Sequence, residues 1–216
     1  MKKAFVRNVI LVLAPLAIGL LAAGCLSRPA LVRQSFLLPT QPAAAPATRP
    51  VGGVLALTSC EVSPPFASQA LVYRIGPNAF ETDPYAEFLV VPDKTLAIAI
   101  RTWLARSGLF SHVAEPGSAA PADQLLQVYV DELYGDLRVP GQPQAVLSLS
   151  LVLLDAKKEN GTRAIFRKEY SQHLPVTTNT AAAIVAGWDQ SLEQIMDEFA
   201  SDLTTTHKPV ARKPSP

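Results

Sequence analysis

The sequence predicts an α+β protein: a single domain in which a mainly antiparallel sheet carries two long amphipathic helices. Several short segments alternate apolar and polar residues with a period of two, as strands with one buried face do. Two longer segments repeat their apolar residues every three or four positions, as helices do. With 24 of the 216 residues assigned to an export signal, 192 remain, which suits one domain with a substantial core.

Residues 1–24 have the layout of a signal peptide. Lys2, Lys3 and Arg7 precede an apolar run over residues 9–23, the order of charge and hydropathy that directs secretion. The run holds 15 residues, whereas a helix that crosses a bilayer needs about 20. A cleaved signal is therefore favoured over a permanent transmembrane segment.

The signal ends in Leu-Ala-Ala-Gly-Cys at residues 21–25, which resembles the lipobox of bacterial lipoproteins. The resemblance implies that Cys25 is the lipid-attachment site, carrying diacylglycerol and acyl chains such as palmitate, and becomes the new N-terminus. The alternative is an ordinary secretory signal with a chance cysteine. Cys60 is the only other cysteine, so no intramolecular disulfide is expected, and its predicted role is that of a small buried residue in a strand.

The chain divides into four predicted parts. The signal peptide at 1–24 is followed by residues 25–52, which comprise the lipid anchor, a short strand at 35–38 and a Pro/Ala linker. The sequence leaves open whether this strand joins the main sheet or belongs to the tether. Residues 53–204 form the α+β domain. Residues 205–216 form a basic, proline-containing tail that is predicted to be disordered.

The first half of the domain predicts strands at 53–60 and 70–75, then an apolar stretch at 87–91 that stops at Pro92. A helix follows from Asp93, with one apolar face and a stop signal at Gly108. The residues of this face are Leu96, Ile100, Trp103 and Leu104.

The second half predicts a short strand at 110–113 and a loop at 115–122, then strands at 125–133, 145–154 and 163–173. The turns between the last three strands are short, so they form an antiparallel meander. A final helix begins at Asn179 or Thr180, either of which can cap it. Its apolar stripe consists of Ile184, Val185, Trp188, Leu192, Ile195, Met196, Phe199 and Leu203.

The sequence contains none of the common catalytic or cofactor motifs, which predicts a protein that is not an enzyme and binds no cofactor. Its three histidines, His112, His173 and His207, lack ligand spacing, so no metal site is expected. Once the signal's three basic residues are removed from the 19 in the chain, 16 remain against 18 acidic residues. This balance argues against nucleic acid as a partner.

Two groups of polar residues and two tryptophans are candidates for binding sites. Asp131, Glu132 and Asp136 form either a cation site or, the favoured interpretation, a solvated strand end before a turn at Gly135. Asp83, Tyr85 and Glu87 are expected in a Pro-interrupted loop between two strands, where they contact a partner or are surface residues. Trp103 and Trp188 are expected in the core, with a lipid-lined groove between helix and sheet as the alternative.

Several short motifs, and above all the order of the elements, resemble the ABC-type transport auxiliary lipoproteins, a family that includes the paraquat-inducible lipoprotein of MCE-type transport systems. The resemblance extends over nearly all of the mature chain, including the meander and the long final helix. The motifs are Phe36-Leu37-Leu38-Pro39, Leu71-Val72-Tyr73-Arg74, the Pro77-Asn78 turn, Tyr85, Pro92 and Ser107-Gly108-Leu109-Phe110.

The resemblance implies a non-catalytic accessory subunit that docks a periplasmic MCE assembly and its ABC permease and ATPase in lipid transport. Leu26 and Ser27 follow the cysteine without the Asp that retains enterobacterial lipoproteins at the inner membrane. The expected location is therefore the periplasmic face of the outer membrane. Two alternatives stay open: a periplasmic module that itself binds a lipid or small apolar ligand, and an assembly lipoprotein for outer-membrane components.

Overall fold

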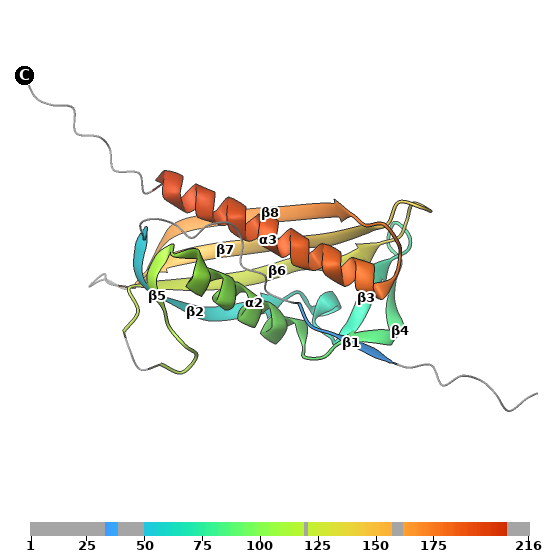
Figure 1. Ribbon diagram of the computed structural model, residues 1–216, viewed down its shortest axis with the longest axis horizontal. Helices are drawn as coiled ribbons and strands as arrows, with labels where there is room; N and C mark the ends of the chain where they lie inside the picture. Colours follow the sequence, from blue (N-terminus) through green and yellow to red (C-terminus); the bar gives the residue numbers. More distant parts are fainter. Residues whose placement is uncertain (1–32, 39–49, 119–120, 157–161, 207–216) are drawn as a thin grey trace, which may run out of the picture. The chain divides into compact units, whose positions relative to one another are not determined.

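The computed structural model describes residues 33–38, 50–118, 121–156 and 162–206. Within these ranges the chain forms one eight-stranded sheet, two long helices and a short 3-10 helix (Figure 1). The helices are η1 (Pro64–Phe66), α2 (Pro92–Ser107) and α3 (Ala181–Thr206). The strands are β1 (Gln34–Phe36), β2 (Gly52–Val62), β3 (Ala70–Arg74), β4 (Phe80–Phe88), β5 (Phe110–Val113), β6 (Gln124–Asp136), β7 (Gln144–Asp155) and β8 (Arg163–Pro175).

Strand β6 is the centre of the sheet because both of its edges are paired. Along one edge it runs antiparallel to β7 from Gln124 to Asp136, and β7 in turn runs antiparallel to β8. These pairings confirm the predicted meander. Along its other edge, β6 pairs in parallel with β2 as far as Val130, and with β3 at Gly135 and Asp136.

The α+β class is confirmed, although the sheet is more mixed than the sequence pattern suggests. β5 pairs in parallel with β2, β1 pairs in parallel with β4, and β3 and β4 are antiparallel. Strand β1 therefore belongs to the sheet, a point that the sequence left open. Side chains alternate between the two faces in parallel and antiparallel strands alike, so a period of two identifies a strand without giving its direction.

The ends of both helices follow local sequence signals. Pro92 opens α2, and Gly108 closes it with a φ of 67°, the left-handed conformation that glycine adopts without strain. At the start of α3, the hydroxyl of Thr180 accepts a hydrogen bond from the backbone N–H of Ala183 (3.4 Å). Thr180 is thus the cap, and α3 continues to Thr206, two residues beyond the predicted end of the domain at residue 204.

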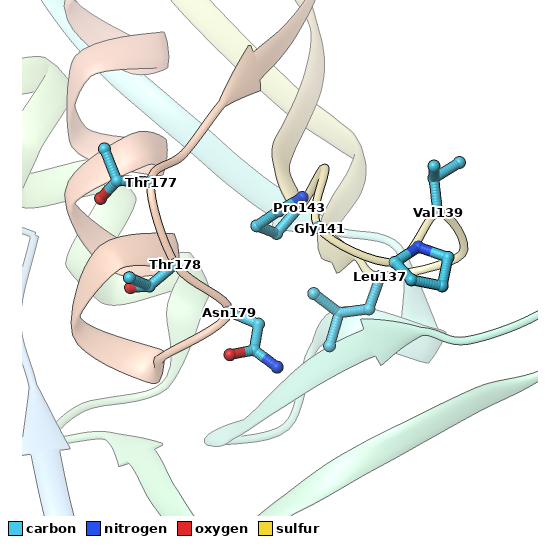
Figure 2. Close-up of a pocket in the computed structure, with 8 residues that line it drawn as sticks. Leu137, Val139, Gly141, Pro143, Thr177, Thr178 and Asn179 are labelled. Carbon is cyan, nitrogen blue, oxygen red and sulfur yellow. The ribbon is translucent and has the colours of Figure 1, made fainter.

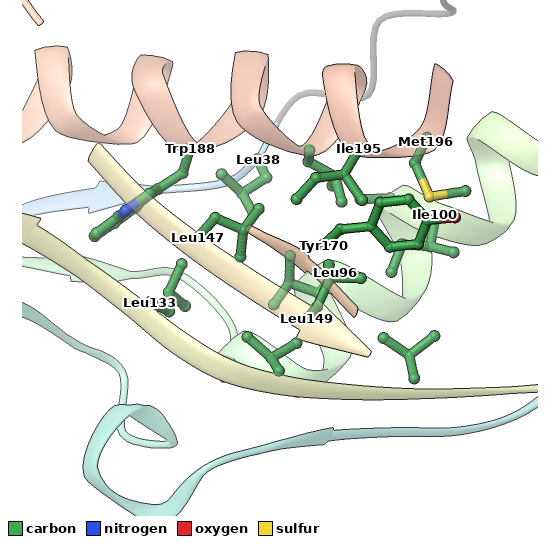
Figure 3. Close-up of a cluster of buried hydrophobic side chains, with 14 of the residues drawn as sticks. Leu38, Leu96, Ile100, Leu133, Leu147, Leu149, Tyr170, Trp188, Ile195 and Met196 are labelled. Atoms are coloured by element: carbon green, nitrogen blue, oxygen red, sulfur yellow. The ribbon is translucent and has the colours of Figure 1, made fainter. Parts of the chain in front are cut away.

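Both helices cover the same face of the sheet, α2 over β2 and β5 and α3 over β7 and β8 (Figure 1). Figure 3 shows side chains of both helices, such as Ile100 and Ile195, directed toward Leu147 and Leu149 of β7. All four side chains are fully buried. The other face of the sheet, here called the open face, is covered by neither α2 nor α3, and Tyr129 of β6 is exposed there.

The loop predicted around Asp83, Tyr85 and Glu87 is wrong, because all three residues lie within strand β4. Pro84 has no N–H to donate to a neighbouring strand, and this is why the sequence read as a loop. The residues from Asp83 to Tyr85 pair with neither β1 nor β3. One oxygen of Asp83 accepts the N–H groups of Tyr85 and Ala86 instead (2.8 and 2.9 Å), so the strand continues past the proline.

Candidate functional sites

The three acidic residues of the meander do not converge on one point. Asp131 accepts from Ser150 (3.4 Å) and Glu132 from Ser148 (2.9 Å) across the β6–β7 pair. Asp136 is buried and forms an ion pair with Arg138 (2.6 Å), and the hydrogen bond from this guanidinium lowers the pKa of the carboxyl. Each carboxylate thus has its own partner.

The predicted strand end at this place is wrong. Gly135 is buried inside β6, where it pairs with Tyr73 on one side and Ala145 on the other. A Cβ added at Gly135 would lie 2.8 Å from the ring of Tyr73 and 3.1 Å from Ile184 of α3. Glycine is therefore required by the close approach of its neighbours rather than by a turn.

The described residues include no group of three or more His, Cys, Asp or Glu side chains that could hold a metal ion. His112 and His173 are exposed on β5 and β8, while His207 and Cys25 lie outside the described residues. Cys60 is a free, partly buried thiol in β2 that packs against the core. Burial raises the pKa of this thiol to about 12, so it is a poor nucleophile at neutral pH.

Both tryptophans lie in the core, as the favoured interpretation stated. The indole N–H of Trp188 donates to the carbonyl of Tyr134 (3.2 Å), and its ring stacks on Phe88 with 5.6 Å between centroids. Trp103 and Leu192, which would line a lipid groove, are only 6% and 4% exposed. Large side chains fill the space between helix and sheet (Figure 3).

A cavity of about 320 Å³ lies elsewhere, between the β6–β7 turn and the segment that leads into α3 (Figure 2). Its walls combine prolines and aliphatic residues with short polar side chains. They are formed by Leu137, Val139, Pro140, Gly141, Pro143, Thr177, Thr178 and Asn179. A second hollow of about 190 Å³ lies on the open face beside Tyr129. Neither is lined by Trp103 or Leu192.

Sequence analysis missed an aromatic cluster on the open face. Three aromatic rings, those of Phe66, Phe80 and Tyr134, pack against one another with centroid distances of 5.5–6.1 Å. The Arg74 guanidinium lies over the rings of Phe80 and Tyr134. These residues come from four separate elements, so no local spacing predicts their meeting. Only Phe80 is largely exposed, at 48%.

Two hydrogen-bond groups also escaped prediction because they join distant segments. The Tyr73 hydroxyl donates to Asp83 (2.8 Å) across the β3–β4 pair, and the pKa of Tyr73 is raised by burial and by this bond. Lys168 and Tyr170 of β8 both donate to Asp202 (2.6 and 2.8 Å), which connects the sheet to the end of α3. Both carboxylates serve structural bonds.

Exposed apolar side chains gather where β1 and β4 run side by side and β4 leads into α2. The residues are Leu37, Tyr85, Leu89, Val90 and Val91, and we call them the apolar edge patch. Leu37 and Leu89 are more than half exposed. Such clusters on a protein surface commonly mark contact sites.

Neither α2 nor α3 has both the length and the apolar character needed to cross a membrane, and no other helix within the described residues has them. Among structures of known proteins, the chain resembles a DUF330 protein from Xanthomonas campestris (TM-score 0.65, 19% identity, covering 78% of this chain and 93% of that one). It also resembles an uncharacterized protein (TM-score 0.60, 14% identity, covering 80% and 99%). These likenesses establish the fold.

A comparison with curated proteins finds no match. The family described as the ABC-type transport auxiliary lipoprotein component matches residues 36–200. The match begins at the last residue of β1 and ends within α3, so it takes in β2 to β8 together with α2. The chain therefore belongs to the family of ABC-type transport auxiliary lipoprotein components.

Proposed function

We propose that this protein is a non-catalytic accessory subunit of an MCE-type lipid transport system, anchored to the periplasmic face of the outer membrane through Cys25. Family membership carries the proposal, because an auxiliary lipoprotein works beside a permease and an ATPase. In this role, residues 1–24 are the signal peptide and the residues between Cys25 and β1 form the tether. The domain docks on the periplasmic MCE assembly.

The packing of the core favours docking over the alternative of a lipid-binding module. A module that carries a lipid needs an apolar cavity of roughly 300 Å³ or more, whereas Trp188 and Leu192, between α3 and the sheet, are buried in the core. The 320 Å³ cavity lies in loops and has threonine and asparagine side chains in its wall. Its position suits a surface contact better than an acyl chain.

The anchor is tested by comparing the wild type with Cys25→Ala. We expect the wild-type protein to have the mass of an acylated chain that begins at Cys25 and to fractionate with the outer membrane. The variant should lose both properties. Cys60→Ala is the matched control and should change neither, because that thiol is partly buried in β2. An unmodified soluble wild-type chain would overturn the anchor.

The partner is tested by cross-linking in cells that produce this chain together with an MCE protein. We expect the acylated protein to capture that MCE protein. Capture should fall when a core substitution unfolds the domain, even though that variant keeps the acylated cysteine. Retention of an apolar lipid by the purified domain, with no capture of the MCE protein, would favour the ligand-binding alternative.

A further inference from the structure

The short tether limits how far β1 can lie from the lipid anchor. Cys25 and Arg33 are eight positions apart, and eight extended residues span at most about 28 Å. With Cys25 acylated, as proposed above, Arg33 stays within that distance of the bilayer surface whatever path the intervening residues follow. The anchor therefore limits how far the surface beside β1 can lie from lipid.

The pairing of β1 with β4 places apolar side chains on this surface. Phe36 pairs with Phe88, and Phe88 is buried toward the helices. Because side chains alternate between faces, Leu37 and Leu89 point away from the helices. The N–H of Leu89 donates to the carbonyl of Phe36 (2.8 Å), which holds the two leucines beside each other. They are 52% and 56% exposed.

The rest of the apolar edge patch has the composition of a membrane interface. Tyr85 is exposed on β4, which ends one residue before Leu89, and tyrosine is enriched where headgroups meet acyl chains. Arg33 and Lys94 flank the patch with side chains that are 64% and 68% exposed, and they form surface ion pairs with Glu87 (3.2 Å) and Asp93 (3.3 Å). Long basic side chains can lay their stems on apolar surface while their charges reach anionic lipid.

We propose that the apolar edge patch rests on the bilayer that holds the lipid anchor, as a second and peripheral membrane contact. The inference rests on the proposed anchor at Cys25. When β1 and β4 contact the bilayer, β8 faces the periplasm. This strand lies at the far end of the path β1-β4-β3-β6-β7-β8. A protein partner on the same patch would have to fit between the domain and the bilayer, within the reach of the tether.

The test attaches the chain chemically to lipid, so that it does not depend on acylation in the cell. Residues 25–216, produced without the signal, are coupled through Cys25 to maleimide-lipid in vesicles of phosphatidylethanolamine and phosphatidylglycerol. Cys60 is partly buried in β2, and its raised pKa slows the competing reaction. Coupling is confirmed by mass, and Cys60→Ala serves as the background if both thiols react.

The reporter is Tyr85→Trp, read by quenching with brominated lipids. The emission of the buried Trp103 and Trp188, measured in the parent chain, is subtracted. The matched control is Tyr129→Trp, at another exposed tyrosine. Tyr129 lies six positions before the β3-paired Gly135, about 20 Å along β6. We expect the reporter at position 85 to lose most of its emission and the reporter at position 129 to keep it.

A second variant separates the patch from the tether. Leu37→Glu with Leu89→Glu changes two side chains that are mostly in solvent, and it should restore the emission at position 85 while the circular dichroism spectrum stays the same. Equal quenching at both reporters, no quenching at position 85, or quenching that survives the double substitution would each overturn the proposal. Loss of acylation in cells would overturn only the anchor.

Discussion

Two regions of the sheet are built in different ways. In the meander region, β6, β7 and β8 pair along nearly their whole lengths beneath α3, and alternate leucines of β7 are fully buried. In the edge region, β1, β3 and β4 pair through short, interrupted stretches, and apolar side chains remain on the surface. The meander region is held by apolar burial, whereas the edge region depends on a few named hydrogen bonds and keeps a surface free for contact.

The largest expected effect is in the meander region, from Phe199→Ala. Phe199 is fully buried in α3, and its ring packs edge-on against Phe166 of β8 at 5.5 Å. Removing a buried aromatic side chain leaves a cavity and costs about 3–5 kcal/mol. We expect the free energy of unfolding in urea to fall by that amount with an unchanged slope against denaturant.

Phe80→Ala is the matched test in the edge region. Phe80 also packs against two rings, but 48% of it is exposed. Much of its surface therefore stays in water in the folded state, and we expect a loss of about 1 kcal/mol, the scale of an aromatic contact. If both alanine variants lost equal stability, the contrast between the two regions would be wrong.

A medium effect is expected from Asp83→Ala, because Asp83 joins β3 to β4. The substitution removes the acceptor of the buried Tyr73 hydroxyl and of two backbone N–H groups. A hydrogen bond to a charged group contributes about 1.5–3 kcal/mol, and an exposed strand recovers part of this from water, so we expect a loss of about 2 kcal/mol. Hydrogen exchange should rise at Tyr85 and Ala86 and stay unchanged in β7.

The control for this prediction is a double-mutant cycle with Tyr73→Phe. If the Tyr73–Asp83 bond carries part of the effect, the two substitutions together should cost less than the sum of their separate costs. Strict additivity would show that the two side chains act independently. Asp83→Asn, which keeps an acceptor oxygen for the backbone, should cost less than the alanine variant.

The same contrast explains what the sequence could predict. Regular patterns identified the four leucines of β7 from Leu147 to Leu153 and the stripe of α3, because each depends only on spacing within one segment. Local rules for helix ends also identified Gly108 and narrowed the cap of α3 to Asn179 or Thr180, of which the structure uses Thr180. Such features depend only on a few neighbouring residues.

The features that sequence analysis missed depend on residues far apart in the chain. The course of β4 on both sides of Pro84 is set by its pairing with β3 and β1, and the buried place of Gly135 is set by Tyr73 and Ile184. Strands β2 and β6 pair in parallel, but the alternation of apolar and polar side chains in either strand does not indicate this direction. The apolar edge patch likewise arises only when β1 pairs with β4.

The smallest expected effect comes from the charge of one carboxylate on α3, the helix that covers the meander region. Burial, together with the nearby Glu193, raises the pKa of Asp189 on α3 to about 6 from an ordinary value of 3.8. Between those pH values the folded state binds more protons than the unfolded state, so stability falls as pH rises from about 4 to about 6. Above that range the ionised carboxylate destabilises the fold.

Asp189→Asn removes this charge and should therefore raise the free energy of unfolding at pH 7. The expected gain is on the order of 1 kcal/mol after allowance for solvent screening, and it should vanish below about pH 4, where both states are protonated. Asp202→Asn is the control of opposite sign. The hydrogen bond from Lys168 lowers the pKa of Asp202, so its carboxylate stabilises the fold at neutral pH and that contribution is lost as pH falls. Urea unfolding of both variants across this range should give pH profiles with opposite slopes, and parallel profiles would show that neither carboxylate is linked to folding in the way that its surroundings indicate.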